Sequence, residues 1–172
     1  TGGSAAPEPA DDFKPCLISD EGGWNDKSFN QSAKEGMDAA LDELGIEGIE
    51  VDVTKRESFD AFLTEVEARL GPIDVLVNNA GIMPIGAFLE SSQEIERRSV
   101  EINVMGPLTG MRLVLPEMVA RGSGHIVNVA STTGVRGKPF LVGYSTSKGA
   151  VVRFTEALAA EWAAKNVQVN CI

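Results

Sequence analysis

The chain contains a single tyrosine, Tyr144, and a lysine and a serine lie at spacings that suit proton transfer. Lys148 follows the tyrosine by four residues, so on a helix the phenol and the ammonium lie on one face. A cation beside the phenol favours the phenolate, and bringing a free tyrosine to neutrality needs roughly 4 kcal/mol of such stabilisation. Ser131 stands thirteen residues before Tyr144, and its hydroxyl could hold a substrate carbonyl or alcohol. These three residues predict proton-transfer chemistry.

A Tyr-x-x-x-Lys spacing arises by chance in many chains, so the surrounding elements must show whether it indicates a catalytic site. Apolar strands are predicted over 48–54, 73–77 and 126–131, and each is followed by a helical pattern, which is typical of βαβ units and a parallel sheet. Two further strands are expected over 13–20 and 167–172. Helices are expected over 29–44, 57–70, 91–120 with a break near Gly106-Pro107, and 145–165.

From about Ile49 to Ile172 the chain resembles a short-chain dehydrogenase/reductase. The matching residues stand in the family's order and spacing: Asp52-Val53-Thr54, Asn78-Asn79-Ala80-Gly81, Asn103, Ser131 and Tyr144-Ser-Thr-Ser-Lys148. The resemblance implies an NAD(P)-dependent oxidoreductase that acts on an alcohol or carbonyl substrate. Tyr144 would be the general acid/base, Ser131 would orient the substrate, and Asn103 would hold the water of a proton relay.

The same resemblance assigns residues to the cofactor. Lys148 would bind the nicotinamide ribose and favour the Tyr144 phenolate. Asp52 and Val53 would meet the adenine, and Asn79, Ala80 and Gly81 would lie along the cofactor. Each residue also has a purely structural interpretation. Asn78 and Asn79 could cap the turn after a strand, Asn103 could be a polar break in a helix, and Asp52 could serve the next helix, whose capping box would be Thr54-Lys55-Arg56-Glu57.

The first fifty residues differ from that family. After the predicted strand 13–20 no G-x-x-x-G-x-G loop follows, and acidic residues surround Gly22-Gly23, where a pyrophosphate would need backbone N–H groups. Residues 1–50 carry 12 acids and 3 bases, whereas residues 51–172 carry 13 acids and 12 bases. We therefore expect millimolar or undetectable affinity for NAD or NADP, and the sequence favours neither cofactor.

Residues from about 13 to 47 resemble another family, the basic-membrane-protein family of periplasmic nucleoside-binding lipoproteins. The run Asp20-Glu-Gly-Gly-Trp-Asn-Asp26-Lys-Ser-Phe-Asn-Gln-Ser-Ala-Lys-Glu-Gly36 carries this resemblance, and it implies a chimera joined near Glu47. Residues 1–12 would be a flexible tether. The remaining residues, 13–172, would form one domain, with a binding-protein-like βα segment over 13–47 and a dehydrogenase-like segment over 48–172. The dehydrogenase-like part suggests a cytoplasmic location, and the first segment an exported lipoprotein.

These elements predict an α/β three-layer sandwich with a five-stranded parallel sheet. Removing the second strand from the dinucleotide-binding order 3-2-1-4-5-6 gives the flavodoxin-like order 2-1-3-4-5. The strand at 48–54 should then neighbour the strand at 13–20. The chain is also expected to stop before the family's substrate lid, which would exclude water from the site.

Composition narrows the alternatives. The chain of 172 residues has a formal net charge of −10 and no basic stripe, which argues against nucleic-acid binding. No apolar stretch reaches the ~20 residues of a membrane span. The single histidine, His125, excludes multi-histidine metal sites, and Cys16 and Cys171 are expected as buried thiols in strands.

Three functions remain open at this stage. The first is the oxidoreductase, with a small-molecule substrate and a homo-oligomeric state. The second is a noncatalytic chimera of two α/β fragments. The third is a nucleoside-binding module, supported by residues 20–36 alone.

Overall fold

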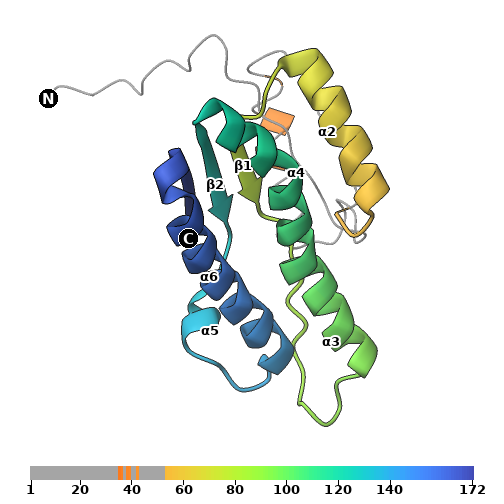
Figure 1. Cartoon of the computed structure of the whole chain (residues 1–172). Helices are drawn as coiled ribbons and strands as arrows, with labels where there is room; N and C mark the ends of the chain where they lie inside the picture. Colours follow the sequence, from red (N-terminus) through yellow and green to blue (C-terminus); the bar gives the residue numbers. More distant parts are fainter. Residues whose placement is uncertain (1–34, 37, 40–41, 43–52) are drawn as a thin grey trace, which may run out of the picture.

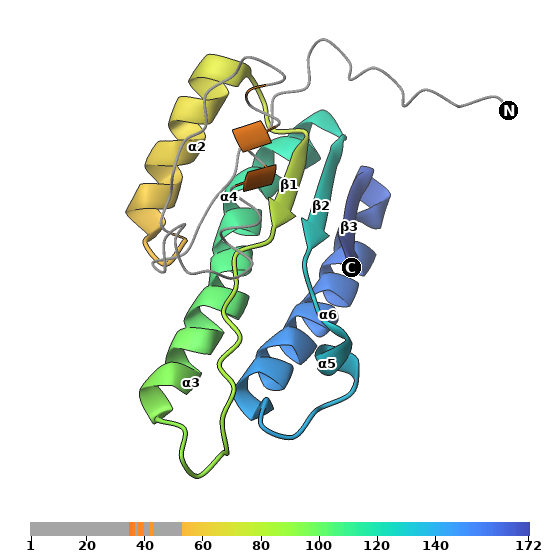
Figure 2. The same cartoon turned by 180° about the vertical axis from the view of Figure 1, so that it is seen from behind.

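A computed structural model describes residues 35–36, 38–39, 42 and 53–172. Within them, three parallel strands form one sheet in the order β1-β2-β3, namely Val75–Asn78, Gly124–Asn128 and Val167–Cys171. Helices connect the strands (Figures 1 and 2). This is the α/β arrangement that the alternation of apolar strands and helical patterns predicts.

The helical elements follow the chain order of the predicted βαβ series. They are α2 (Arg56–Leu70), α3 (Gln93–Val100), the π-helix η1 (Glu101–Met105), α4 (Gly106–Arg121), α5 (Thr132–Val135), α6 (Val142–Trp162) and the 3-10 turn η2 (Ala163–Lys165). Ser92 caps α3 by accepting a hydrogen bond from the N–H of Ile95. Gly122 ends α4 in the left-handed region, with φ +66°, where a glycine avoids a side-chain clash.

The strands alternate between a buried and an exposed face because successive side chains point to opposite sides of a sheet. Leu76, Ile126 and Val169 are paired across the three strands and are all buried. Val75 and Val77 point to the other face of β1 and are about half exposed, at 51% and 53%. The helices α2, α4 and α6 therefore contribute their apolar side chains to the face that carries Leu76.

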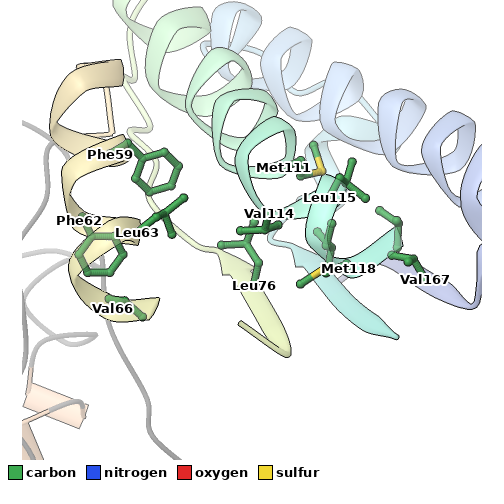
Figure 3. Packing of buried hydrophobic residues seen from close by; sticks show 12 residues of the cluster. Phe59, Phe62, Leu63, Val66, Leu76, Met111, Val114, Leu115, Met118 and Val167 are labelled. Carbon is green, nitrogen blue, oxygen red and sulfur yellow. The ribbon is translucent and has the colours of Figure 1, made fainter. Parts of the chain in front are cut away.

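The hydrophobic core lies between that face of the sheet and these helices (Figure 3). Phe59 and Phe62 stack with their ring centroids 6.3 Å apart, and they reach from α2 toward the sheet. The buried cluster consists of Phe59, Phe62, Leu63, Val66, Leu76, Met111, Val114, Leu115, Met118, Ile126, Val167 and Val169.

Several predictions about the elements need correction. The helical path does not break at Gly106-Pro107. Pro107 lies in the first turn of α4, where its missing N–H and its fixed φ are compatible with a helix. The distortion lies one turn earlier, in η1. The capping box that begins at Thr54 is also wrong, because the N-cap of α2 is Lys55, whose side chain makes no capping hydrogen bond. Helix α6 spans Val142–Trp162 instead of 145–165.

The predicted strands 13–20 and 48–52, the tether, the segment boundaries and the strand order 2-1-3-4-5 lie outside the described residues. Five strands are therefore not confirmed. Val53 and Thr54, at the end of the predicted strand 48–54, form a turn. In the segment 29–44, the described residues 35–36, 38–39 and 42 are helical. Cys171 is a half-buried free thiol in β3, whereas Cys16 is not described. No helix in the described part of the chain is long and apolar enough to cross a membrane.

Candidate active site

Lys148 is the most deeply buried charged group in the described part of the chain, with only 4% of its surface exposed. It lies in α6, one turn after Tyr144, and its Nζ is 5.8 Å from the centroid of the Tyr144 ring. The Nζ donates a 2.6 Å hydrogen bond to the carbonyl oxygen of Val129, just past the end of β2. Burial disfavours the charged form and lowers the pKa of Lys148 to about 8. The predicted Tyr144–Lys148 pair is thus brought together at the carboxyl end of the sheet.

Ser131 follows β2 and is the N-cap of the short helix α5. Its Oγ accepts hydrogen bonds from the Thr133 N–H at 3.2 Å and from the Thr133 hydroxyl at 3.0 Å. Both bonds use lone pairs, so the Ser131 hydroxyl hydrogen remains for a substrate oxygen. Gly134 holds α5 against α6, because a Cβ there would lie 2.6 Å from the backbone carbonyl carbon of Lys148. This close approach lets α5, whose N-cap is Ser131, pack directly on the backbone of α6 at Lys148.

Asn103 is fully buried in η1 and connects three parts of the site. Its Oδ1 accepts from the N–H of Ile82 at 2.8 Å, and its Nδ2 donates to the Ile82 carbonyl at 2.9 Å. The same Nδ2 donates to the hydroxyl of Ser147 on α6, also at 2.9 Å. A π-helix displaces the residues of one turn from their ordinary positions, which often marks a functional site. Asn103 is therefore more than a polar break in the helix, since its amide clamps the loop after β1 to α6.

The predicted cofactor residues after β1 lie around a hollow beside Val53. This hollow is lined by Val53, Phe59, Val77, Asn78, Asn79, Ala80, Gly106 and Pro107. Gly81 lies next to Lys148, since a Cβ on it would be 3.4 Å from the Lys148 Nζ and 3.2 Å from the Asn103 Oδ1. A Cβ at position 81 would therefore press on the Asn103 amide and touch the lysine amine. Asp52 lies outside the described residues.

Sequence reasoning missed the polar groups that hold these residues in place. The Ser147 hydroxyl donates to the Tyr144 carbonyl at 2.8 Å while it accepts from Asn103. Asn78 donates to Asn128 at 2.8 Å, so its side chain reaches the next strand rather than only its own turn. Asn128 in turn donates to Thr155 at 3.0 Å. A signal was present, because Ser147 and Thr155 place hydroxyls on the face of α6 that carries Lys148 and Val151.

A family model described as short chain dehydrogenase matches residues 25–172. The chain belongs to the short-chain dehydrogenase family. The match begins at residue 25, upstream of the join expected near Glu47. It therefore includes part of the segment 13–47, which was expected to resemble a nucleoside-binding lipoprotein. None of the relatives and solved structures described below is a nucleoside-binding lipoprotein, so neither that likeness nor a chimera is supported.

Curated relatives of this short-chain dehydrogenase include nodulation protein G of Azospirillum brasilense, 41% identical over 123 residues, which cover 72% of this chain and 50% of that protein. Galactitol 2-dehydrogenase (L-tagatose-forming) of Cereibacter sphaeroides is 41% identical over 141 residues, covering 79% of this chain and 55% of its own. The chain thus spans about half the length of the curated relatives it matches.

Solved structures of the family share the fold at 31–32% identity. A short-chain dehydrogenase from Streptomyces avermitilis superposes with a TM-score of 0.76 and 32% identity, covering 92% of this chain and 65% of that one. An NAD+-bound xylitol dehydrogenase gives a TM-score of 0.75 and 31% identity, covering 91% and 67%. Their likeness supports a Rossmann-like α/β fold for this chain.

Proposed function

We propose that this short-chain dehydrogenase is an NAD(P)-dependent oxidoreductase that interconverts an alcohol and a carbonyl. The observation that carries the proposal is the buried Lys148 amine, held by the Val129 carbonyl one helical turn from Tyr144. Ser131 stands at the same carboxyl edge of the sheet with a hydroxyl hydrogen free of the bonds described above. A proton donor, a cation beside it and a hydroxyl for the substrate are the groups that this chemistry needs.

The described residues fit a nicotinamide cofactor in two places. Gly81 lets the backbone pass close to Lys148 and Asn103, where a Cβ would lie only 3.2 Å from the Asn103 Oδ1, and the hollow beside Val53, Asn79 and Ala80 offers an apolar wall. We assign Lys148 to the nicotinamide ribose and Val53, with Asp52, to the adenine. When bound, NAD(P) supplies the hydride acceptor or donor.

The chain's own residues then move the proton. In the direction of carbonyl reduction, the Tyr144 hydroxyl gives its proton to the substrate oxygen while the Ser131 hydroxyl donates a hydrogen bond to that oxygen. Lys148 in its ammonium form favours the resulting phenolate. We assign Asn103 to the water that would return a proton to the site.

We further propose that this chain binds its cofactor weakly, because the sequence carries no G-x-x-x-G-x-G loop. Each backbone hydrogen bond to phosphate contributes about 1.5–3 kcal/mol, so losing three weakens binding by several orders of magnitude. The same observation favours a second candidate, a noncatalytic scaffold that retains the family's residues.

A calorimetric titration of the purified chain with NADH and NADPH tests the oxidoreductase proposal. Millimolar binding that weakens further in Lys148→Ala, with Tyr144→Phe binding as the parent does, would support it. A cooperatively folded chain that binds neither dinucleotide would favour the scaffold. A micromolar dissociation constant would contradict only the weak-binding part. Titration with a nucleoside tests the binding-module alternative, which no described residue favours.

We also propose that the chain self-associates through a groove between α4 and α6. The groove is apolar, with opposite charges among its lining residues: Leu108, Met111, Arg112, Leu115, Pro116, Val119, Leu158, Glu161 and Trp162. A two-fold arrangement would pair Arg112 with Glu161 of a second copy.

Sedimentation of Arg112→Glu, of Glu161→Arg and of the double variant tests this pairing. Each single variant should dissociate and the double variant should reassociate; a parent chain that is monomeric at all concentrations would contradict the proposal.

A further inference from the structure

A chain of hydrogen bonds crosses the interior from β1 through β2 to α6. The Nδ2 of Asn78 donates to the Oδ1 of Asn128 at 2.8 Å, and the Nδ2 of Asn128 donates to the Oγ1 of Thr155 at 3.0 Å. The Thr155 hydroxyl donates at 2.7 Å to the carbonyl of Val151, one turn earlier in α6. Asn128 is 0% and Thr155 3% exposed, so the Asn128–Thr155 and Thr155–Val151 bonds form away from water, whereas the Asn78 end is half-buried.

Asn128 uses its whole amide in this chain. Its Oδ1 accepts from Asn78, and its two N–H groups reach Thr155 and, at 3.7 Å, the sulfur of Met111. The strand register places Asn78 directly opposite Asn128. Because hydrogen bonds are directional and apolar contacts are not, these bonds fix both the rotation and the axial position of α6 on the sheet. A buried network with every member satisfied specifies one arrangement of the core.

The next contact along both elements is the one that defines the candidate site. Val129 follows Asn128 in the chain, and its carbonyl receives the Lys148 Nζ. Lys148 precedes Thr155 by two helical turns, so moving forward along β2 corresponds to moving backward along α6. Two residues further along the chain from Val129 lies Ser131, and one turn before Lys148 in α6 lies Tyr144. A slip of α6 by one turn, about 5.4 Å, would take Lys148 out of reach of Val129 and Tyr144 away from Ser131.

We propose that the Asn78–Asn128–Thr155 chain of hydrogen bonds positions α6 so that Lys148 and Tyr144 meet Ser131 at the end of β2. The three residues touch no reacting atom, so they are positioning residues. This inference rests on the proposed oxidoreductase site.

The test replaces Thr155 by two residues of similar size. Thr155→Val keeps the shape and removes the hydroxyl, whereas Thr155→Ser keeps the hydroxyl. The readout is the pKa of Lys148, followed by NMR on the chain with carbon-13-labelled lysine, together with the free energy of unfolding in urea. With the hydroxyl gone, α6 loosens, water reaches the ammonium, and the pKa of Lys148 should rise by roughly one unit. Thr155→Ser should leave it near the parent value.

The matched control is Val66→Ala in α2, a buried apolar position at the far side of the core. It should lower stability without moving the pKa of Lys148. The inference is overturned if Thr155→Val loses stability as this control does while the pKa of Lys148 stays unchanged, or if Thr155→Ser behaves like Thr155→Val.

Asn78→Ala provides a second test should Thr155→Val fail to fold. It removes the outer end of the network at a half-buried position and leaves the Asn128–Thr155 bond in place. A smaller rise in the pKa of Lys148 is expected, and no rise would also overturn the inference. The measurement needs no cofactor. A parent chain that fails to bind NADH therefore counts against the proposed function, whereas an unmoved lysine counts against the positioning role alone.

Discussion

Two parts of the interior are built in different ways. Under α2 and α4 the buried side chains are apolar, with Phe59, Val114 and Leu76 among them. Around the end of β2 and the part of α6 that faces it, the buried side chains are instead polar: Asn103, Asn128, Ser147, Lys148 and Thr155. The last turns of α6 rejoin the apolar region through Phe154, Leu158 and Trp162. The first region is stabilised by the burial of apolar surface, which does not depend on direction. The second is stabilised by hydrogen bonds, which are directional, and a buried polar group that loses its hydrogen-bond partner destabilises the fold.

This difference explains why the candidate site lies between the end of β2 and α6. A buried ammonium is tolerated only beside an acceptor, and the Val129 carbonyl at the end of β2 supplies one. The apolar region provides most of the stability, while the polar region gives α6 one position. Four changes test this division.

Phe59→Ala should have the largest effect because it empties the center of the apolar region. The ring is 1% exposed and packs so closely that a Cβ on Gly110 would lie 2.8 Å from it. We expect the free energy of unfolding to fall by about 3–5 kcal/mol, measured by urea denaturation. In the remaining folded protein, the pKa of Lys148 should not change. A large movement of that pKa would show that the two regions are not separate.

The pH dependence of stability should report the polar region. The pKa of Lys148 is about 8 in the folded chain, against an ordinary value of 10.5. Between these values the unfolded chain binds more protons, so the free energy of unfolding should rise with pH over this window, by about 3 kcal/mol. Urea denaturation at a series of pH values measures the slope. In Lys148→Met the slope should be lost; an equal slope in that variant would assign it to other groups.

Matched substitutions at buried positions of β1 and β2 should separate directional from apolar packing. Leu76→Met conserves volume in the apolar region and should cost less than about 1.5 kcal/mol. Asn128→Leu also keeps a similar size, yet it leaves the Asn78 amide without its partner and should cost about 1–3 kcal/mol. Thermal unfolding of both variants measures the difference. Equal costs would mean that the polar region is held by packing alone.

Phe140→Gly should have the smallest effect, in the loop before α6. Phe140 has φ +65°, which strains a side chain with a Cβ, and its carbonyl accepts from the N–H of Gly86 at 3.0 Å. Its ring is 61% exposed, so little packing is lost. Relief of strain by about 1–2 kcal/mol should outweigh the entropy cost of glycine, about 0.5–1 kcal/mol, and stabilise the chain slightly. A clear loss of stability in urea denaturation would indicate that the packing of the Phe140 ring contributes more than the strain at φ +65° costs.

The order of the elements could be predicted from the sequence because it depends on local periodicity. The apolar runs at 73–77 and 126–131 became β1 and β2 with shifted ends, and the parallel pairing followed from the helices between them. Helix ends were less predictable. The position of Gly106-Pro107 suggested a break, but the irregular turn is the π-helix η1 just before it, where Asn103 accepts a hydrogen bond from the N–H of Ile82 in the loop after β1.

The sequence by itself determined that Tyr144 and Lys148 share a face, since helical geometry links residues four apart whatever surrounds them. It also determined that Ser131 lies at the carboxyl end of a strand segment and that Asn79, Ala80 and Gly81 follow another strand. Only the tertiary structure decided that the Lys148 amine meets the Val129 carbonyl, that Asn103 clamps Ile82 to Ser147, and that Asn128 joins Asn78 to Thr155. These contacts join residues far apart in the chain, and their geometry depends on strand register and on the seating of α6, which no local pattern encodes.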